Sequence, residues 1–136
     1  MKYLLDTNVC IALINGSSGK ARARFVRAEM AGATFAISSI VVHELWYGVA
    51  KSTLVERNAR ALAVFLGSSI AVLEFRETDA RAAGEIRAEQ ERQGRRIGEY
   101  DTLIAGQAYA RNLTVVTANT REFERVKGLA VEDWEE

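Results

Sequence analysis

The stretch KYLLDTN at positions 2–8 decides the fold of this chain. Lys2–Leu5 has the apolar and aromatic composition of a buried strand, and Asp6 follows it without a linker. The apolar spacing of Thr7–Asn15 then predicts a helix, which any of the three polar residues from Asp6 to Asn8 can cap. A strand that passes directly into a helix is typical of layered α/β folds. Ligands bind beyond the carboxyl ends of the strands in such folds, so Asp6 is a candidate site residue.

The same alternation continues along the chain. Strands are predicted at Lys2–Leu5, Thr34–Ser38, Ile70–Phe75 and Leu113–Thr117, with a weaker fifth at Leu129–Glu132. Helices are predicted at Thr7–Asn15, Lys20–Ala31, Ser39–Ser52, Leu54–Leu66, Thr78–Gln93 and Glu99–Asn112, with a short helical turn at Thr120–Val126. We expect Ser39 and Thr78 to cap helices, and Gly67 and Gly94 to end them. This order predicts a parallel sheet of four to five strands with helices on both faces.

The amino-acid composition excludes several classes of protein and of functional site. The 136 residues suit a single domain spanning 1–136, and 49% hydrophobic with 26% charged residues excludes intrinsic disorder. Cys10 and His43 are the only residues of their kinds, which excludes a disulfide within the chain and zinc sites built on cysteine or paired histidines. We expect a cytoplasmic protein, because no signal-peptide pattern or long apolar segment is present.

The charge balance bears on nucleic-acid binding. Eighteen basic residues match eighteen acidic ones, so the formal net charge is zero. A protein that holds nucleic acid mainly by bulk positive charge would be basic overall. Any contact with nucleic acid must therefore come from local clusters of basic side chains.

Two acids lie next to apolar helix positions. Glu44 shares a predicted helix face with apolar neighbours such as Val41 and Leu45, where a carboxylate is costly unless a cation compensates it. Asp101 lies one turn before Ile104 and falls in the first turn of its helix. An ion pair or an exposed edge would explain Glu44 without a site, and the helix dipole alone would explain Asp101.

A shared site explains Asp6, Glu44 and Asp101 together. Carboxylates that converge at the carboxyl edge of a sheet repel and raise each other's pKa, and a divalent cation removes that cost. Ligands that are all oxygen favour Mg²⁺ or Mn²⁺ over zinc. The chemistry that fits is metal-dependent hydrolysis of a phosphodiester.

Five stretches follow one another along the whole chain: YLLDTNV at 3–9, SSIVVHELWYG at 38–48, IGEYDTLIAGQA at 97–108, VTANTREF at 116–123, and the ending VKGL to EDW at 126–134. Together they resemble the motifs of PIN-domain ribonucleases, specifically VapC-type toxins of bacterial toxin–antitoxin pairs. The resemblance implies a PIN-like three-layer α/β/α fold. It also implies an endoribonuclease whose catalytic and metal-binding residues are Asp6, Glu44 and Asp101, with Mg²⁺ or Mn²⁺ as cofactor.

The fourth motif departs from the family pattern. Asn119 stands near a point where many PIN domains carry an acid, so Asn119 could hold a metal-bound water, or Glu122 could supply the missing charge. We expect one well-occupied metal in the free protein. Further candidates for the pocket are Thr7, Asn8, Glu99 and Thr117.

The resemblance also implies partners. It predicts a homodimer and a cognate VapB-like antitoxin that covers the acidic pocket, with structured RNA, commonly tRNA, as substrate. The apolar faces of Val9–Leu13 and Leu62–Leu66 either line such contacts or pack on the sheet, which we favour. Arg95, Arg96 and Arg121 flank the third and fourth motifs and are predicted to contact RNA phosphates. For the basic residues of Lys20–Arg27 we favour a solvated helix face.

Two alternatives stay open from the sequence. The chain could be a PIN-like binding module without activity, a reading that the amide at Asn119 supports. A haloacid-dehalogenase-type phosphatase also carries an acid after its first strand, but it needs a second acid two residues later, where this chain has Asn8.

Overall fold

The computed structural model describes residues 1–136. All five strands form one parallel sheet in the order β3-β2-β1-β4-β5. The strands are β1 (Lys2–Leu5), β2 (Thr34–Ser38), β3 (Ala71–Leu73), β4 (Thr114–Val116) and β5 (Val131–Glu132). The helices are α1 (Thr7–Asn15), α2 (Gly19–Met30), α3 (Ser39–Lys51), α4 (Val55–Leu66), α5 (Glu77–Arg92), α6 (Glu99–Arg111) and α7 (Thr120–Phe123).

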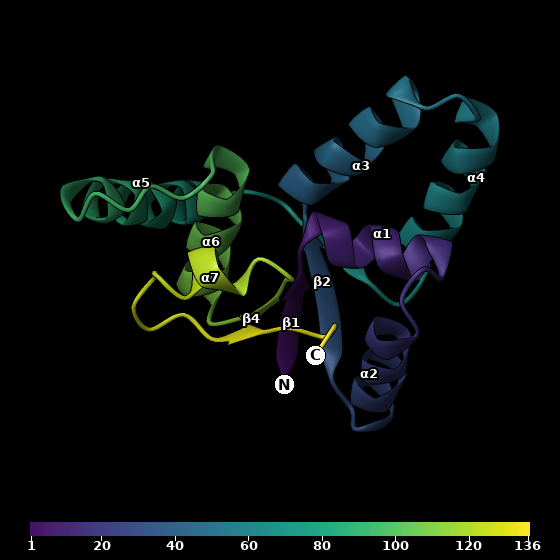
Figure 1. The fold of residues 1–136 in the computed structure, drawn as a ribbon, viewed down its shortest axis with the longest axis horizontal. Coiled ribbons are helices and arrows are strands. Elements are labelled where there is room, and N and C mark those ends of the chain that lie inside the picture. The colour runs from purple at the N-terminus through teal and green to yellow at the C-terminus, as the bar shows by residue number, and fades with distance from the viewer.

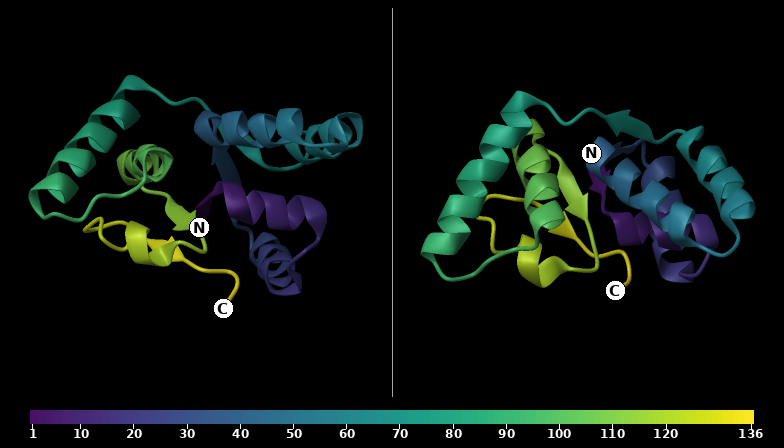
Figure 2. Two further views of the ribbon diagram at one scale, coloured as in Figure 1. Left: turned by 45° about the horizontal axis from the view of Figure 1, so that its top comes forward. Right: turned by 90° about the horizontal axis from the view of Figure 1, so that it is seen from above.

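The helices form two layers, one on each face of the sheet. Helices α1 to α4 gather on one side, and α5 to α7 on the other (Figure 1). The two turned views keep these groups apart (Figure 2). The three-layer α/β/α prediction is therefore confirmed. None of the helices has the length and apolar character that crossing a membrane requires.

The strand order creates a switch point between β1 and β4. The chain steps from β1 to β2 and β3 in one direction, then crosses the sheet to β4 and β5 on the other side. The helices that follow β1 and β4 consequently leave toward opposite faces, and open α/β sheets bind their ligands in the crevice at such a point. Asp6 follows β1 and Thr117 follows β4, so both lie at this switch point.

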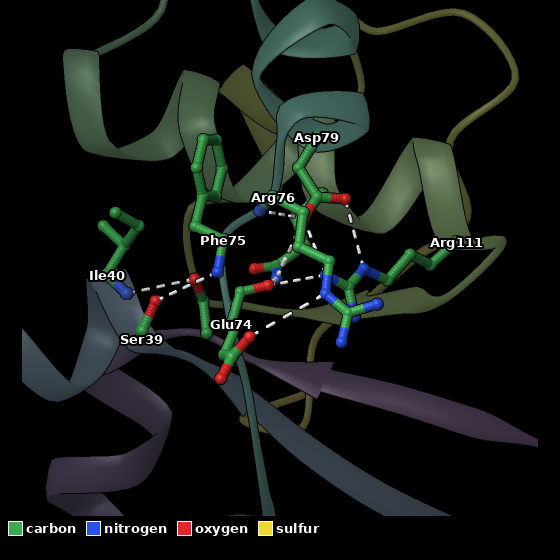
Figure 3. Close-up of polar contacts among 9 residues, drawn as sticks. Ser39, Ile40, Glu74, Phe75, Arg76, Asp79 and Arg111 are labelled. Atoms are coloured by element: carbon green, nitrogen blue, oxygen red, sulfur yellow. Dashed lines mark hydrogen bonds and ion pairs between the residues drawn. The ribbon is translucent and has the colours of Figure 1, made fainter.

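Two predicted helix caps were wrong. Ser38, not Ser39, caps α3, and its hydroxyl accepts a hydrogen bond from the Ile40 amide at 3.1 Å. The Ser39 hydroxyl instead accepts from the amide of Phe75 at 3.2 Å and ties α3 to the chain after β3 (Figure 3). Helix α5 begins one residue before Thr78, which is exposed and caps nothing.

Strands β3 (Ala71–Leu73) and β4 (Thr114–Val116) are shorter at both ends than the predicted Ile70–Phe75 and Leu113–Thr117. Gly67 does follow α4 directly as its C-cap, while Gly94 lies two residues beyond the end of α5 with φ of 67°. A left-handed backbone of this kind suits glycine, which has no Cβ to clash.

A buried ion pair that the sequence analysis missed joins α5 to α6. Asp79 is fully buried, and its carboxylate accepts two hydrogen bonds from Arg111, at 3.1 and 2.7 Å (Figure 3). Asp79 also accepts from the Arg76 amide at 2.8 Å. Burial acts to raise the pKa of Asp79, but the Arg111 guanidinium and the Arg76 amide outweigh it and hold the pKa below its usual range.

Candidate active site

Asp6 is held rigidly at the end of β1. Its amide donates to the carbonyl of Val116 at 2.9 Å, and only 6% of the residue is exposed. Its carboxylate accepts from the Thr7 amide at 2.7 Å, which caps α1, and from the Thr117 hydroxyl at 2.8 Å. Burial raises the pKa of Asp6, and the two hydrogen bonds only partly oppose that rise. Asp6 is thus both a helix cap and a buried acid at the switch point.

Asp101 lies in the first turn of α6, on the other layer. The predicted apolar face behind it is present, since Ile104, Ala105 and Ala108 are fully buried. Burial, and then the negative charge of Asp6, raise the pKa of Asp101 to about 6. The mutual effect expected of converging carboxylates therefore acts on Asp101, while burial dominates at Asp6.

The loop after β4 links these two acids. The Asn119 amide N–H donates to the Thr117 hydroxyl at 2.9 Å, and that hydroxyl donates on to Asp6. The Asn119 side-chain amide donates to Asp101 at 3.0 Å and also to Glu122. Asp6, Thr117, Asn119, Asp101 and Glu122 are therefore joined in one hydrogen-bonded network.

Glu44 reaches the site through Thr7. The side chain is half-buried on α3 and accepts a hydrogen bond from the Thr7 hydroxyl at 2.8 Å. No lysine or arginine pairs with it, so the ion-pair explanation for Glu44 fails. Its neighbour Leu45 joins Ile11, Ile14 and Leu62 in lining a groove of about 290 Å³ between α1, α3 and α4, and Glu44 lies in that lining.

The donor set suits a hydrated divalent cation. None of the five ion pairs of the chain includes Asp6, Glu44 or Asp101, so their charges are uncompensated. No group of three or more acidic, histidine or cysteine side chains converges closely enough to enclose an ion. Mg²⁺ retains several waters and is commonly held by only one or two carboxylates, which Asp6 and Asp101 can supply.

The remaining pocket candidates lie apart from this network. Asn8 is exposed and makes no hydrogen bond through its side chain. Glu99 is exposed and lines a different groove, of about 400 Å³, between α5 and α6. His43 is exposed with its ring 5.6 Å from that of Tyr100, and Cys10 is buried, which raises the pKa of its thiol.

The structure divides the predicted RNA-contacting arginines. Arg95 and Arg121 line one hollow, together with Arg125. Arg96 instead lines the groove between α5 and α6. In the first basic cluster, Arg24 pairs with Glu132 at 3.5 Å, and the rest of α2 presents exposed basic residues, as favoured.

The apolar helix faces pack in the core on one side only, as favoured. Val9, Cys10 and Leu62 are buried in the core, whereas Ile11 remains 41% exposed and Val64 77% exposed. Ile11 lines the groove between α1, α3 and α4, and contact of these outer residues with a partner stays a prediction. What the sequence missed at the site is the bridging role of the Thr117 hydroxyl, although Thr117 follows a strand just as Asp6 does.

Comparisons with known proteins identify the family of this chain. The model of the PIN domain family matches residues 3–129. The chain is 46% identical over 134 residues to the "tRNA(fMet)-specific endonuclease VapC" of Shigella flexneri, covering 98% of each chain. It also matches two solved structures. The first is VapBC2 from Rickettsia felis bound to a DNA fragment from its promoter, with a TM-score of 0.91 and 40% identity over 98% of this chain and 99% of that chain. The second is DNA-bound VapBC from Salmonella typhimurium, with a TM-score of 0.88 and 43% identity over 98% of each chain. Similarity of this degree along nearly the whole length means that the protein belongs to the PIN-domain family and, within it, to the VapC ribonucleases.

Proposed function

We propose that the chain is the toxin of a toxin–antitoxin pair and cleaves RNA phosphodiesters with Mg²⁺ or Mn²⁺ held by Asp6 and Asp101. Glu44 completes the site either on the metal directly or through water, since Thr7 occupies one of its oxygens and leaves the other free. The observation that carries the proposal is the pair of uncompensated carboxylates at the switch point, Asp6 buried and Asp101 half-buried, where desolvation and then the charge of Asp6 raise the pKa of Asp101 to about 6. Such a pair is costly without a cation and favourable with one.

The protein groups have separate tasks in this mechanism. Thr117 and the Thr7 amide fix the two oxygens of Asp6, while Asn119 orients Asp101 and holds Glu122 nearby. The second oxygen of Glu44 accepts no hydrogen bond from the protein and is free to orient a water. When bound, the ion supplies Lewis-acid stabilisation of the phosphate and activates water at neutral pH.

The substrate is inferred from the relatives. The Shigella flexneri protein is named for specificity toward tRNA(fMet), and it is 46% identical to this chain. Initiator tRNA, or another structured RNA in the cytoplasm, is accordingly the proposed substrate.

The partner is inferred in the same way. The solved relatives are VapBC complexes. We infer a VapB-like antitoxin and a toxin homodimer. The apolar groove that ends at Glu44 offers an antitoxin segment a path to the acidic site.

Cleavage of defined RNAs tests the proposal. Purified chain without antitoxin is incubated with initiator tRNA and with an elongator tRNA, in Mg²⁺, Mn²⁺ or chelator, and new ends are mapped. We expect discrete cleavage that requires metal and that falls at least about 100-fold in Asp101→Asn, which removes a ligand charge. Asp133→Asn serves as a matched control, because Asp133 bonds only near its own chain position.

The alternative is an inert binding module, and the amide that Asn119 presents in place of an acid supports it. Stabilisation of the protein by Mn²⁺ without any new RNA ends would favour the inert module. Cleavage that persists unchanged in Asp101→Asn would reveal a contaminating nuclease. A dehalogenase-type phosphatase is disfavoured, since exposed Asn8 supplies no second acid.

A further inference from the structure

Three arginines from separate segments face one hollow beside α7. Arg95 comes from the loop between α5 and α6, Arg121 from α7, and Arg125 from the turn after α7. With Glu124 they line a space of about 370 Å³, which we call the arginine hollow.

A frame of hydrogen bonds fixes these segments relative to one another. The buried side chain of Gln90, which is only 4% exposed, donates its amide to the Arg125 carbonyl at 2.9 Å. The backbone carbonyl of Gln90 accepts from the backbone amide of Arg95 at 2.8 Å, and the Arg125 guanidinium donates to the backbone carbonyl of Arg96 at 3.0 Å. The positions of Arg95 and Arg125 are thus set by one buried residue of α5.

The charge of the hollow is not neutralised within the protein. None of the five ion pairs includes Arg95, Arg121 or Arg125. Glu124 is the single carboxylate in the lining. Guanidinium groups held together repel unless an anion lies among them, and phosphate is the anion whose geometry they match. In a chain of zero net charge, such a cluster is a local anion site.

The hollow adjoins the acidic site. Arg121 precedes Glu122, which accepts from Asn119, and Asn119 also donates to Asp101. The acidic network thus reaches the helix that carries Arg121, so a polyanion with its reacting phosphate at the carboxylates has the arginine hollow within reach along its backbone. The basic residues of α2 do not share this position, because α2 lies across the molecule from α7 in each view (Figures 1 and 2).

We propose that the arginine hollow binds backbone phosphate of the RNA next to the cleaved linkage. The proposal rests on the nuclease function proposed above and names Arg125, in place of Arg96, as the third contact. Guanidinium contacts to phosphate position a nucleic acid without reading its bases. The hollow consequently contributes affinity and register, while sequence choice lies elsewhere.

Binding of labelled, unfractionated tRNA in chelator, over a series of potassium chloride concentrations, tests the hollow without cleavage. The test variant is Arg95→Gln/Arg121→Gln, which leaves the Arg125 bond to Arg96 in place. We expect affinity to fall about 10-fold or more, and the slope of log K against log salt to become shallower by about 0.7 for each lost contact. Adding Arg125→Gln should deepen both effects.

Two controls carry the same or half the charge change. Lys20→Gln/Arg22→Gln alters exposed residues of α2, and Arg96→Gln alters the neighbour of Arg95 that faces the other groove. Both should keep the wild-type slope within about 0.3, well under the change expected for one phosphate contact. A slope for Arg95→Gln/Arg121→Gln equal to that of the α2 control would overturn the proposal.

Two further measurements distinguish failure of the hollow proposal from failure of the nuclease proposal. Mn²⁺ titration should give the same affinity in wild type and in Arg95→Gln/Arg121→Gln, because the hollow does not hold the metal. If wild-type protein cleaves no RNA, yet Arg95→Gln/Arg121→Gln still shows the shallower slope, the nuclease is rejected and the hollow is retained. An acidic peptide is tested for binding in parallel. If Arg95→Gln/Arg121→Gln binds tRNA as wild type does and loses only the peptide, the hollow is assigned to a protein partner and RNA is rejected.

Discussion

The side-chain amide of Asn119 donates a hydrogen bond to Asp101 at 3.0 Å and a second one to Glu122. One neutral residue thereby offers donors to two carboxylates that would otherwise face each other. The Asn119 hydrogen bond lowers the pKa of Asp101, while burial, Asp6 and Glu122 raise it. The amide therefore limits the cost of an acidic site that holds no cation.

Replacing this amide with an acid should make the folding stability of the protein depend on a bound metal ion. Asn119→Asp removes the donor and adds a like charge, so we expect the free energy of unfolding in chelator at pH 7 to fall by about 1–3 kcal/mol. Mn²⁺ should raise the melting temperature more in Asn119→Asp than in wild type. Asn15→Asp, at an exposed position, is the control. Equal melting temperatures in chelator for both variants would contradict the role given to Asn119.

The raised pKa of Asp101 predicts a pH dependence of stability. The ordinary value is 3.8, and the folded value is about 6. Between them the folded state binds more protons than the unfolded state, so stability without metal should decrease as pH rises through this range and then level off. Because Asp101 is half-exposed, solvent screening limits the loss to about 1 kcal/mol.

Urea unfolding in chelator at several pH values measures this effect. Asp101→Asn should flatten the curve, since the substituted side chain does not titrate. Saturating Mn²⁺ should also remove the decline, because the ion compensates the charge that burial disfavours. A decline that is equally steep in Asp101→Asn would place its origin in another group.

The contact between α5 and α6 leaves no room for one methyl group. A Cβ added at Gly106 would lie 2.6 Å from the Cα, Cβ and backbone nitrogen of Ala83, whereas a Cβ at Gly84 would meet nothing within 4 Å. Gly106→Ala should therefore destabilise by about 1–3 kcal/mol through overpacking. Gly84→Ala should be neutral or stabilise by up to about 1 kcal/mol, because alanine favours helix. Thermal unfolding compares the two, and similar shifts would argue against so close an approach.

The ion pairs of Arg111 and Arg87 should differ greatly in their contribution to the free energy of unfolding. Arg111→Met leaves the fully buried Asp79 without its partner and should cost about 3–5 kcal/mol. Arg87→Met breaks an exposed pair with Glu91 and should cost less than about 0.5 kcal/mol. The double variant Asp79→Leu/Arg111→Met should recover much of the loss, which chemical denaturation can measure. If the double variant recovers no stability, the hydrogen bond of Asp79 at the start of α5 contributes more to stability than its charge does.

Local patterns in the sequence predicted the order of strands and helices, and they singled out the three acids, whose catalytic role stays a prediction. The bounds of β1, β2 and α1 are those expected, because apolar runs and capping residues are local signals. The caps at Ser39 and Thr78 were misplaced by one or two residues. At these helix starts several polar residues compete, and tertiary partners such as Phe75 decide which hydroxyl caps and which bonds elsewhere.

The sequence by itself determined that Asp6 follows the first strand, that Glu44 and Asp101 lie on helices beside apolar residues, and that helices alternate with strands. Only the tertiary structure decided which distant side chains meet: Thr117 with Asp6, Asn119 with Asp101, Arg111 with Asp79, and Arg125 with Arg95 in the hollow. Periodicity assigns a residue to a face of its own element, within reach of its neighbours in sequence. Contacts between elements depend on strand order and on the loops that cross the sheet, and these follow from the packing of the whole chain.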